Sequence, residues 1–410
     1  MRFPALFFTH NHTRFTQPIM TSNKALISIF LVVAVDVLGL TIVIPLLPFY
    51  AQEFGGTPIV VGLLFASFAV CQFLAGPVLG RISDRIGRRP TLIFSQIGTF
   101  IGFLVLGFAN TLFLLFLARI IDGITAGNLS IAQAYISDVT KPEERTKAFA
   151  FIGIAFGLGF LIGPAMSGFL SDFGHSVPAF AAAGLSLASI ICTITLLPST
   201  EITHSPAPRK GRFSGFAEYL RRPETRRSLL EFFAFTLAFA LLIGGFALFL
   251  ERQFGFKAKE TGYLFAFSGL IGAIVQGGLV GRLAAAWGEV RLSTIGFLAM
   301  ALSYIPMGFI HDWRIFLIGV VVGGFGSSVT RPALTTLLTK SVGPHEQGEA
   351  LGVSQSLNSI AQIIGPLIAG FLIEQQQLVL YGITAAVIAL CGMFLTLQSK
   401  PPAPTHVAEG

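Results

Sequence analysis

The stretch Gly80-Arg-Ile-Ser-Asp-Arg-Ile-Gly-Arg-Arg-Pro90 places four arginines and one aspartate within eleven residues. Apolar segments of membrane-spanning length flank it on both sides. Backbone inside a bilayer has to satisfy its own hydrogen bonds, so we expect the flanking segments to be helices and the stretch to be a short hairpin at the membrane surface. Gly80 and Gly87 permit a tight turn. A topology anchor is the simplest interpretation, but the spacing Gly-x-x-x-Asp-x-x-Gly-Arg-Arg favours a more specific role.

Composition indicates a polytopic membrane protein. The chain has 410 residues, of which 53% are hydrophobic and only 11% are charged, whereas soluble domains carry about 25% charged residues. The net charge of +7 comes from basic residues in short loops between apolar segments, which argues against a nucleic-acid-binding protein. Three cysteines lie inside apolar stretches and predict neither a disulfide nor a metal framework. Cofactors and enzymatic activity are not expected, since the sequence holds no nucleotide-binding loop or catalytic triad.

Apolar segments predict an all-α integral membrane protein with twelve transmembrane helices in two pseudo-symmetric six-helix bundles. A Pro-, Arg- and Ser-rich stretch without an apolar run separates the bundles. The expected regions are a disordered segment 1–23, a first bundle 24–197, a linker 198–227, a second bundle 228–398 and a tail 399–410. The expected helices are 24–48, 58–80, 90–109, 111–138, 146–171, 177–197, 228–250, 261–286, 291–310, 313–339, 348–373 and 378–398.

Basic residues are concentrated in alternate loops and in the linker. The loops 51–57 and 107–111 carry almost none of them. Cytoplasmic loops of membrane proteins carry an excess of Lys and Arg, so we expect both termini and the linker in the cytoplasm.

The two halves repeat each other. The segment 162–170 matches 364–372 at an offset of 202 residues, and Gly80, Arg81 and Gly87 match Gly281, Arg282 and Gly288 at an offset of 201. Parallel repeats of this kind describe two bundles related by an axis along the membrane normal, with a substrate site between them near the midplane.

These motifs resemble those of the twelve-helix drug:proton antiporters of the major facilitator superfamily, close in pattern to the tetracycline efflux pumps. The resemblance covers about residues 24–398. It rests on the loop 80–90, on Arg119-x-x-x-Gly123, and on an antiporter motif in the fifth helix. The motif residues are Gly157, Gly159, Gly163, Pro164 and Gly168. Ala285 and Glu289 depart from the loop pattern in the second half, which predicts a weaker or differently controlled second gate.

The resemblance implies proton-coupled export of small amphipathic compounds by alternating access, from a bacterial inner membrane and as a monomer. It also implies that the arginine loop closes the cytoplasmic side by clasping neighbouring helix ends. Asp138 is a candidate partner for Arg85 or Arg88. The expected gating residues are Gly80, Asp84, Arg85, Gly87, Arg88, Arg89 and Asp138.

Asp36 lies about twelve residues into the first helix and therefore near mid-bilayer. An ionised carboxylate there costs about 2.5–3.5 kcal/mol or more, so it should face a cavity or a partner, and burial favours its protonated form. We expect Asp36 to exchange the coupling proton; a permanently protonated Asp that bonds a neighbouring helix is the alternative. Asp122 is one turn from Arg119, so the two should pair and form a secondary proton site.

Helices four and ten carry polar stripes at steps of three or four residues, which suggests that each stripe lines one helix face. At the 202 offset the two stripes coincide, and Asp122 maps to Gly324. We expect both to face the central cavity; a polar seam buried between helices is the alternative. The expected cavity residues are Ser130, Gln133, Ser328, Arg331, Thr335 and, on helix eleven, Asn358.

Two further functions stay open at this point. One is a facilitator or symporter for a sugar or organic anion, in which Arg119 and Arg331 would bind the anion. The other is a receptor or scaffold without transport, which the intact Asp84 loop and Asp36 argue against.

Overall fold

A computed structural model describes residues 22–140, 145–198, 218–343 and 346–398, without the side chains of residues 22–26 and 145–151. Its described secondary structure consists of helices, and the all-α membrane fold predicted from the sequence is confirmed. In chain order the helices are α1 Ser22–Glu53, α2 Pro58–Ile86, α3 Arg88–Gly107, α4 Leu112–Thr125, α5 Asn128–Val139, α6 Arg145–Ser171, α7 Ser176–Leu196, α9 Pro223–Phe254, α10 Ala258–Ile274, the π-helical turn η2 Val275–Leu279, α11 Val280–Tyr304, α12 Trp313–Lys340, α13 Gln347–Glu374 and α14 Leu378–Leu397.

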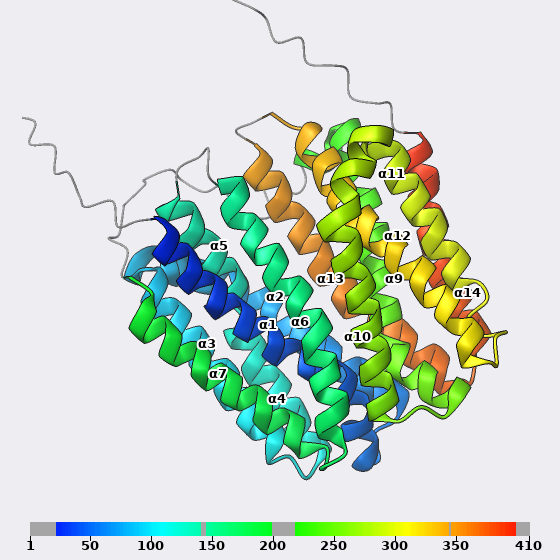
Figure 1. Cartoon of the computed structure of the whole chain (residues 1–410), viewed down its shortest axis with the longest axis horizontal. Helices are drawn as coiled ribbons and strands as arrows, with labels where there is room; N and C mark the ends of the chain where they lie inside the picture. The colour runs from blue at the N-terminus through cyan, green and yellow to red at the C-terminus, as the bar shows by residue number, and fades with distance from the viewer. Residues whose placement is uncertain (1–21, 141–144, 199–217, 344–345, 399–410) are drawn as a thin grey trace, which may run out of the picture.

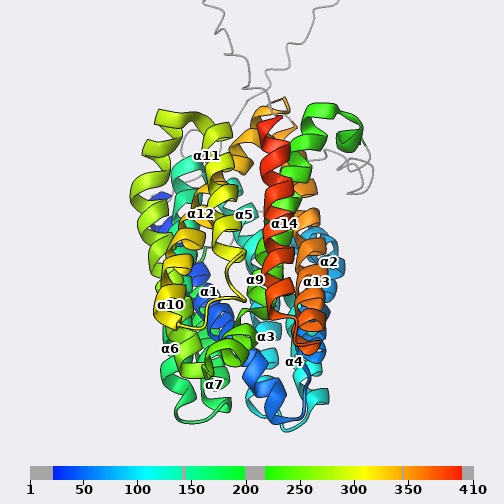
Figure 2. The same ribbon diagram turned by 90° about the vertical axis from the view of Figure 1, so that its right-hand side faces the viewer.

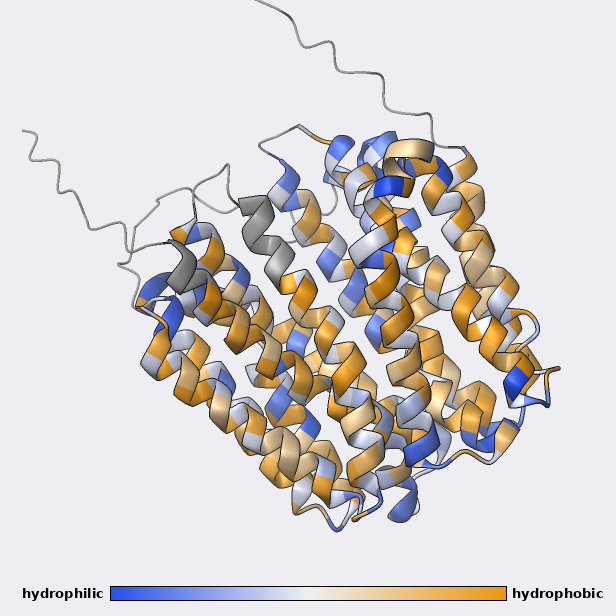
Figure 3. Cartoon of the chain, viewed as in Figure 1, coloured by the Kyte–Doolittle hydropathy of each residue, from blue (hydrophilic) through white to orange (hydrophobic). Residues whose placement is uncertain are grey.

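Eleven helices of the described chain are long and apolar enough to cross a membrane, and one of them contains two spans. This helix, Ala258–Tyr304, has 47 residues, roughly 70 Å at 1.5 Å per residue and about twice the thickness of a hydrocarbon core. Gly288 has the non-helical dihedrals φ 75° and ψ 160° and divides it. Twelve spans result, and their apolar middles lie between more polar ends (Figure 3).

The helices run between the same two ends of the molecule (Figures 1 and 2). We call the end at which α1 begins and α14 ends the terminal end, and the other the opposite end. The first half consists of α1–α7 and the second of α9–α14. Across the halves, α6 packs against α10 and α2 packs against α13. A continuous core of buried aliphatic and aromatic side chains runs through both halves.

Glycines make the contacts between the halves close. A Cβ atom at Gly168 would lie 2.7 Å from the Lys259 carbonyl oxygen, and one at Gly370 would lie 2.5 Å from the Pro58 carbonyl oxygen. Small residues let membrane helices approach in this way. Both contacts lie toward the opposite end, whereas a Cβ atom at Gly80, Gly157 or Gly352 would meet no atom within 4 Å. The two halves are thus packed together mainly at the opposite end.

Several helices differ from the predicted bounds. The expected continuous helix 111–138 is broken at Ala126–Gly127, where Ala126 has φ −72° and ψ 67°. The seventh span starts at Pro223, a favourable first-turn residue, and ends at Phe254, after which Gly255 takes a left-handed conformation. Residues 218–221 of the expected linker are helical as well. The predictions for most of segment 1–23, for most of the linker and for the tail 399–410 lie outside the described residues.

Candidate functional site

Asp36 on α1 lies in a polar cluster inside the first half. Its neighbours are Gln96 on α3, Ser189 on α7 and Asn128 on α5. Gln96 donates a hydrogen bond to Ser189 Oγ at 2.7 Å. Both carboxyl oxygens of Asp36 are buried and have no hydrogen-bond partner among the described residues. The carboxyl therefore faces helices of its own half. An ion without a partner would be costly there.

The predicted pair between Arg119 and Asp122 on α4 is formed. Arg119 Nη2 lies 3.2 Å from Asp122 Oδ2, and both side chains are buried. The guanidinium lies 4.4 Å from the centre of the Phe68 ring on α2. On α3, Gly102 leaves room for the acid, since a Cβ atom there would lie 3.0 Å from Asp122 Cβ. This second polar cluster also lies within the first half.

The arginine loop connects the terminal ends of α2, α3 and α5. Arg88 contacts Asp84 Oδ1 at 2.5 Å through Nη1 and Asp138 Oδ2 at 2.7 Å through Nε, so the predicted partner Asp138 is found beside Arg88. Arg89 donates to the carbonyl of Ile194 on α7. Arg85 is exposed. The ion pairs that the structure gives for this loop stay within the first half.

The second half carries the same loop pair with its charges exchanged. Lys340 Nζ lies 2.6 Å from Glu289 Oε1. Glu289 corresponds to Arg88 at the offset of 201, and Lys340 corresponds to Asp138 at 202. The departure at Glu289 is therefore compensated by Lys340, which the sequence reasoning missed although the offset would have revealed it.

The stripe on the fourth span has both buried and exposed members, and its position on the central cavity stays a prediction. Asp122 is buried within its half, whereas Ser130 and Gln133 are exposed. The physical reason is the break at Ala126–Gly127, which interrupts the helical register between α4 and α5.

The stripe residues on α12 differ in how far they are buried. Ser328 is buried beside Gly272 of α10. Arg331 is exposed, and Thr335 is half-buried and donates to the Arg331 carbonyl oxygen at 2.9 Å. Asn358 on α13 is half-buried. Arg331 has no ion-pair partner among the residues that the structure places.

The antiporter motif of α6 has two faces. Gly159 and Gly163 pack against α1, where Thr41 Oγ1 donates to the Gly159 carbonyl oxygen at 2.8 Å. Pro164 and Gly168 pack against α10, across the halves. At Gly157, by contrast, the space around the backbone is open. One helix thereby joins the Asp36 helix to the second half.

Three polar contacts join the halves at the opposite end, and sequence reasoning missed them. Gln52 Nε2 donates to Glu251 Oε2 at 2.7 Å, the Ile59 amide donates to Glu374 Oε2 at 2.9 Å, and Lys259 pairs with Asp172 at 2.5 Å. The only sequence signal for these contacts is that each contains a charged residue near the end of a span: Glu251, Glu374, or Lys259 with Asp172. In the described part of the chain, no group of three or more His, Cys, Asp or Glu side chains could hold a metal ion.

Comparisons with known proteins agree with this architecture. Residues 29–288 and 277–410 match the Major Facilitator Superfamily. The chain is 30% identical to the class D tetracycline resistance protein of Salmonella ordonez over 390 residues, 93% of this chain and 98% of that protein. It is 30% identical to multidrug resistance protein 1 of Bacillus subtilis (strain 168) over 368 residues, 89% of this chain and 94% of that protein.

Among solved structures, a bacterial homolog of the human lysosomal transporter Spinster, in an inward-facing and unoccupied conformation, superposes with a TM-score of 0.75. The two are 17% identical, and the match covers 95% of this chain and 100% of the other. Fold, repeats and loop motif define a secondary transporter of two pseudo-symmetric bundles. The chain belongs to the Major Facilitator Superfamily.

Proposed function

We propose that this transporter exports small amphipathic compounds, tetracycline-like molecules among them, in exchange for protons. The observation that carries the proposal is the buried, unpartnered carboxyl of Asp36 in a transporter whose relatives include tetracycline and multidrug resistance proteins. Intramembrane carboxyls of this kind are costly and are typical of proton relays.

The proton enters and leaves at Asp36 in this proposal. A neutral carboxyl is compatible with its buried position, and an ionised one requires water or a partner, so loss of the proton favours a rearrangement of α1. Because α6 packs on α1 through Gly159 and Gly163 and on α10 through Gly168, movement of α1 would reach the second half. The Arg119–Asp122 pair is a secondary proton site.

Substrate access alternates between the two ends. The contacts of Gln52, Ile59 and Lys259 close the opposite end. We assign the terminal end to the cytoplasm, because the arginine loop lies there. The conformation therefore corresponds to one open toward the cytoplasm, and the arginine loop would clasp the second half in the other state. The weak pairing of partly exposed ions suits a gate that has to open.

The second candidate function is transport of an organic anion, and it rests on Arg331. Arg119 is engaged with Asp122 and is not available for an anion, whereas Arg331 is exposed and unpaired among the described residues. An anionic substrate would require Arg331 for binding, while a neutral or zwitterionic drug would not.

Purified protein in sealed proteoliposomes with an internal pH dye distinguishes the candidates. In the wild type, tetracycline added on one side should draw protons toward that side, because the drug and the protons move in opposite directions. An organic anion that moves without proton exchange, and tetracycline that does not move, would refute the export proposal. Arg331→Gln should leave tetracycline transport in place if the protein exports drugs. It should abolish transport of the organic anion if the anion is the substrate.

A further inference from the structure

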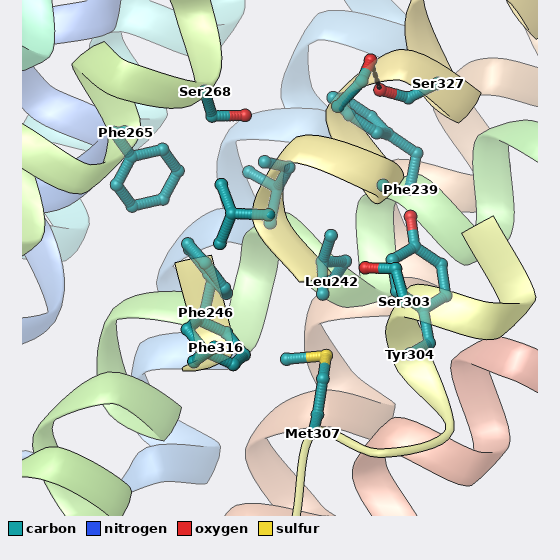
Figure 4. A pocket seen from close by; sticks show the side chains of 14 residues that line it. Phe239, Leu242, Phe246, Phe265, Ser268, Ser303, Tyr304, Met307, Phe316 and Ser327 are labelled. Carbon is teal, nitrogen blue, oxygen red and sulfur yellow. Dashed lines mark hydrogen bonds between the residues drawn. The ribbon is translucent and has the colours of Figure 1, made fainter. Parts of the chain in front are cut away.

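The second half encloses a cavity that none of the motifs above accounts for. It has a volume of about 50 Å³ and lies between α9, α10, the end of the ninth span and α12 (Figure 4). A single water needs about 10–15 Å³ measured in this way. The space is therefore large enough for a group of several heavy atoms, although not for a whole drug.

Five aromatic side chains contribute to its wall. Phe239, Phe246, Phe265 and Phe316 lie around it, together with the ring of Tyr304. None of the fourteen lining residues is charged. Such a wall suits a flat, uncharged ring, because ring edges and faces pack favourably on one another.

Two hydroxyl groups on the wall are uncommitted. The hydroxyls of Tyr304 and Ser268 make no hydrogen bond to the described residues, and Figure 4 shows both at the cavity. By contrast, Ser303 donates to the Gly319 carbonyl and Ser327 donates to the Gly324 carbonyl. A polar group beside an apolar cavity is costly to leave without a partner. A ligand oxygen could therefore bond to Tyr304 or Ser268.

The pseudo-symmetry relates this wall to the first half. Gly324 on the cavity wall corresponds to Asp122 at the offset of 202. In the first half this position belongs to the buried Arg119–Asp122 pair. In the second half the position has no side chain and no charge, and a Cβ atom at Gly324 would lie 3.1 Å from the Ile271 side chain.

The cavity is bordered by side chains of α9 that are only partly buried. Phe239, Leu242 and Ile243 are half-buried, whereas Phe246, Tyr304 and Phe316 are buried. Leu237, also on α9, corresponds to Asp36 on α1 at the offset of 201. The accessible side of the cavity therefore lies on α9, the second-half equivalent of the helix that carries Asp36.

We propose that this cavity is a binding subsite for a neutral aromatic ring bearing an oxygen, and that it receives that part of the transported compound. That the transported compound enters this cavity rests on the proposed export function, while binding of the ring itself does not. The ring would pack on the phenylalanines, and its oxygen would bond to the Tyr304 hydroxyl.

The test uses 4-iodophenol and iodobenzene with the full-length protein. In crystals soaked with 4-iodophenol, anomalous scattering should place iodine in this cavity. Binding to protein in lipid nanodiscs is measured by equilibrium dialysis against empty nanodiscs. Ser268→Leu should weaken binding of both compounds by about tenfold or more, because its larger side chain occupies the space. Tyr304→Phe should weaken 4-iodophenol by roughly 2- to 10-fold, the value of one hydrogen bond, and leave iodobenzene unchanged.

Tyr381→Phe is the matched control. Tyr381 is another buried tyrosine of the second half, but its hydroxyl donates to the Leu242 carbonyl oxygen at 2.6 Å and does not line the cavity. It should leave binding of both compounds unchanged. Iodine found only elsewhere, undiminished binding by Ser268→Leu, or equal losses in Tyr304→Phe and Tyr381→Phe would each overturn the subsite. Failure of proton exchange with tetracycline in the wild type would instead refute the export function and leave the iodophenol result standing.

Discussion

Gly370→Ala should open the contact between the two halves at the opposite end. The added Cβ atom would lie 2.5 Å from the Pro58 carbonyl oxygen and 3.0 Å from Ile59 Cα, whereas ordinary contact begins at 3.4 Å. The helices α2 and α13 would have to separate by about 1 Å, and the neighbouring bond from the Ile59 amide to Glu374 at 2.9 Å would weaken. Overpacking of this size costs about 1–3 kcal/mol, which lowers the equilibrium constant for closure of the opposite end by roughly 5- to 150-fold.

Spin labels on cysteines at Phe173 and Phe309 report this change by electron-electron double resonance. Both residues are exposed loop positions of the opposite end, one in each half. The background has the three native cysteines replaced. Gly370→Ala should shift the distance distribution toward longer values. Gly352→Ala on the same helix meets no atom within 4 Å and should leave it unchanged. Both substitutions replace a helical glycine with alanine, so both gain about 1 kcal/mol in helix propensity. Identical distributions for the two variants would refute the reasoning.

Three further predictions concern the ion pairs. Asp122→Asn leaves the Arg119 charge buried without compensation and should destabilise the protein by about 3–5 kcal/mol, seen as a lowered Tm in detergent; an unchanged Tm would contradict the buried pair. Glu289→Lys should weaken the second-half loop by about 0.2–1 kcal/mol, and adding Lys340→Glu should restore transport, which independent losses would disprove. Asp84→Asn should reduce transport without affecting membrane insertion, and cysteine labelling should find more cytoplasm-open molecules; normal transport would remove Asp84 from the gate.

The fold could be predicted because hydropathy and repeats act over long stretches. Apolar runs of about twenty residues define spans, and the match of residues 162–170 to 364–372 pairs the halves. Span ends were less predictable, since helices such as α9 continue past the apolar run to a proline and a glycine cap. No proline marks the break at Ala126–Gly127, so the sequence did not predict it. The stripe containing Asp122 and Gln133 was therefore expected on one helix face.

Sites were predictable where a local sequence rule applies. Arg119 and Asp122 are three residues apart on a helix, and their pairing follows from that spacing. The environment of Asp36 depends on Gln96 and Ser189, which only tertiary packing brings near it. Likewise the cavity beside Tyr304 is a consequence of how four spans pack, and no single stretch of sequence contains it.

The central claim, that the Asp36 carboxyl carries the coupling proton, is tested most directly by proton flux in Asp36→Asn. The asparagine has nearly the same shape and cannot release a proton at neutral pH, so folding and tetracycline binding should be retained. In proteoliposomes with an internal pH dye, wild-type protein should exchange protons for tetracycline. Asp36→Asn should show no proton movement while still permitting downhill tetracycline exchange. A proton signal from Asp36→Asn equal to that of the wild type would contradict the account.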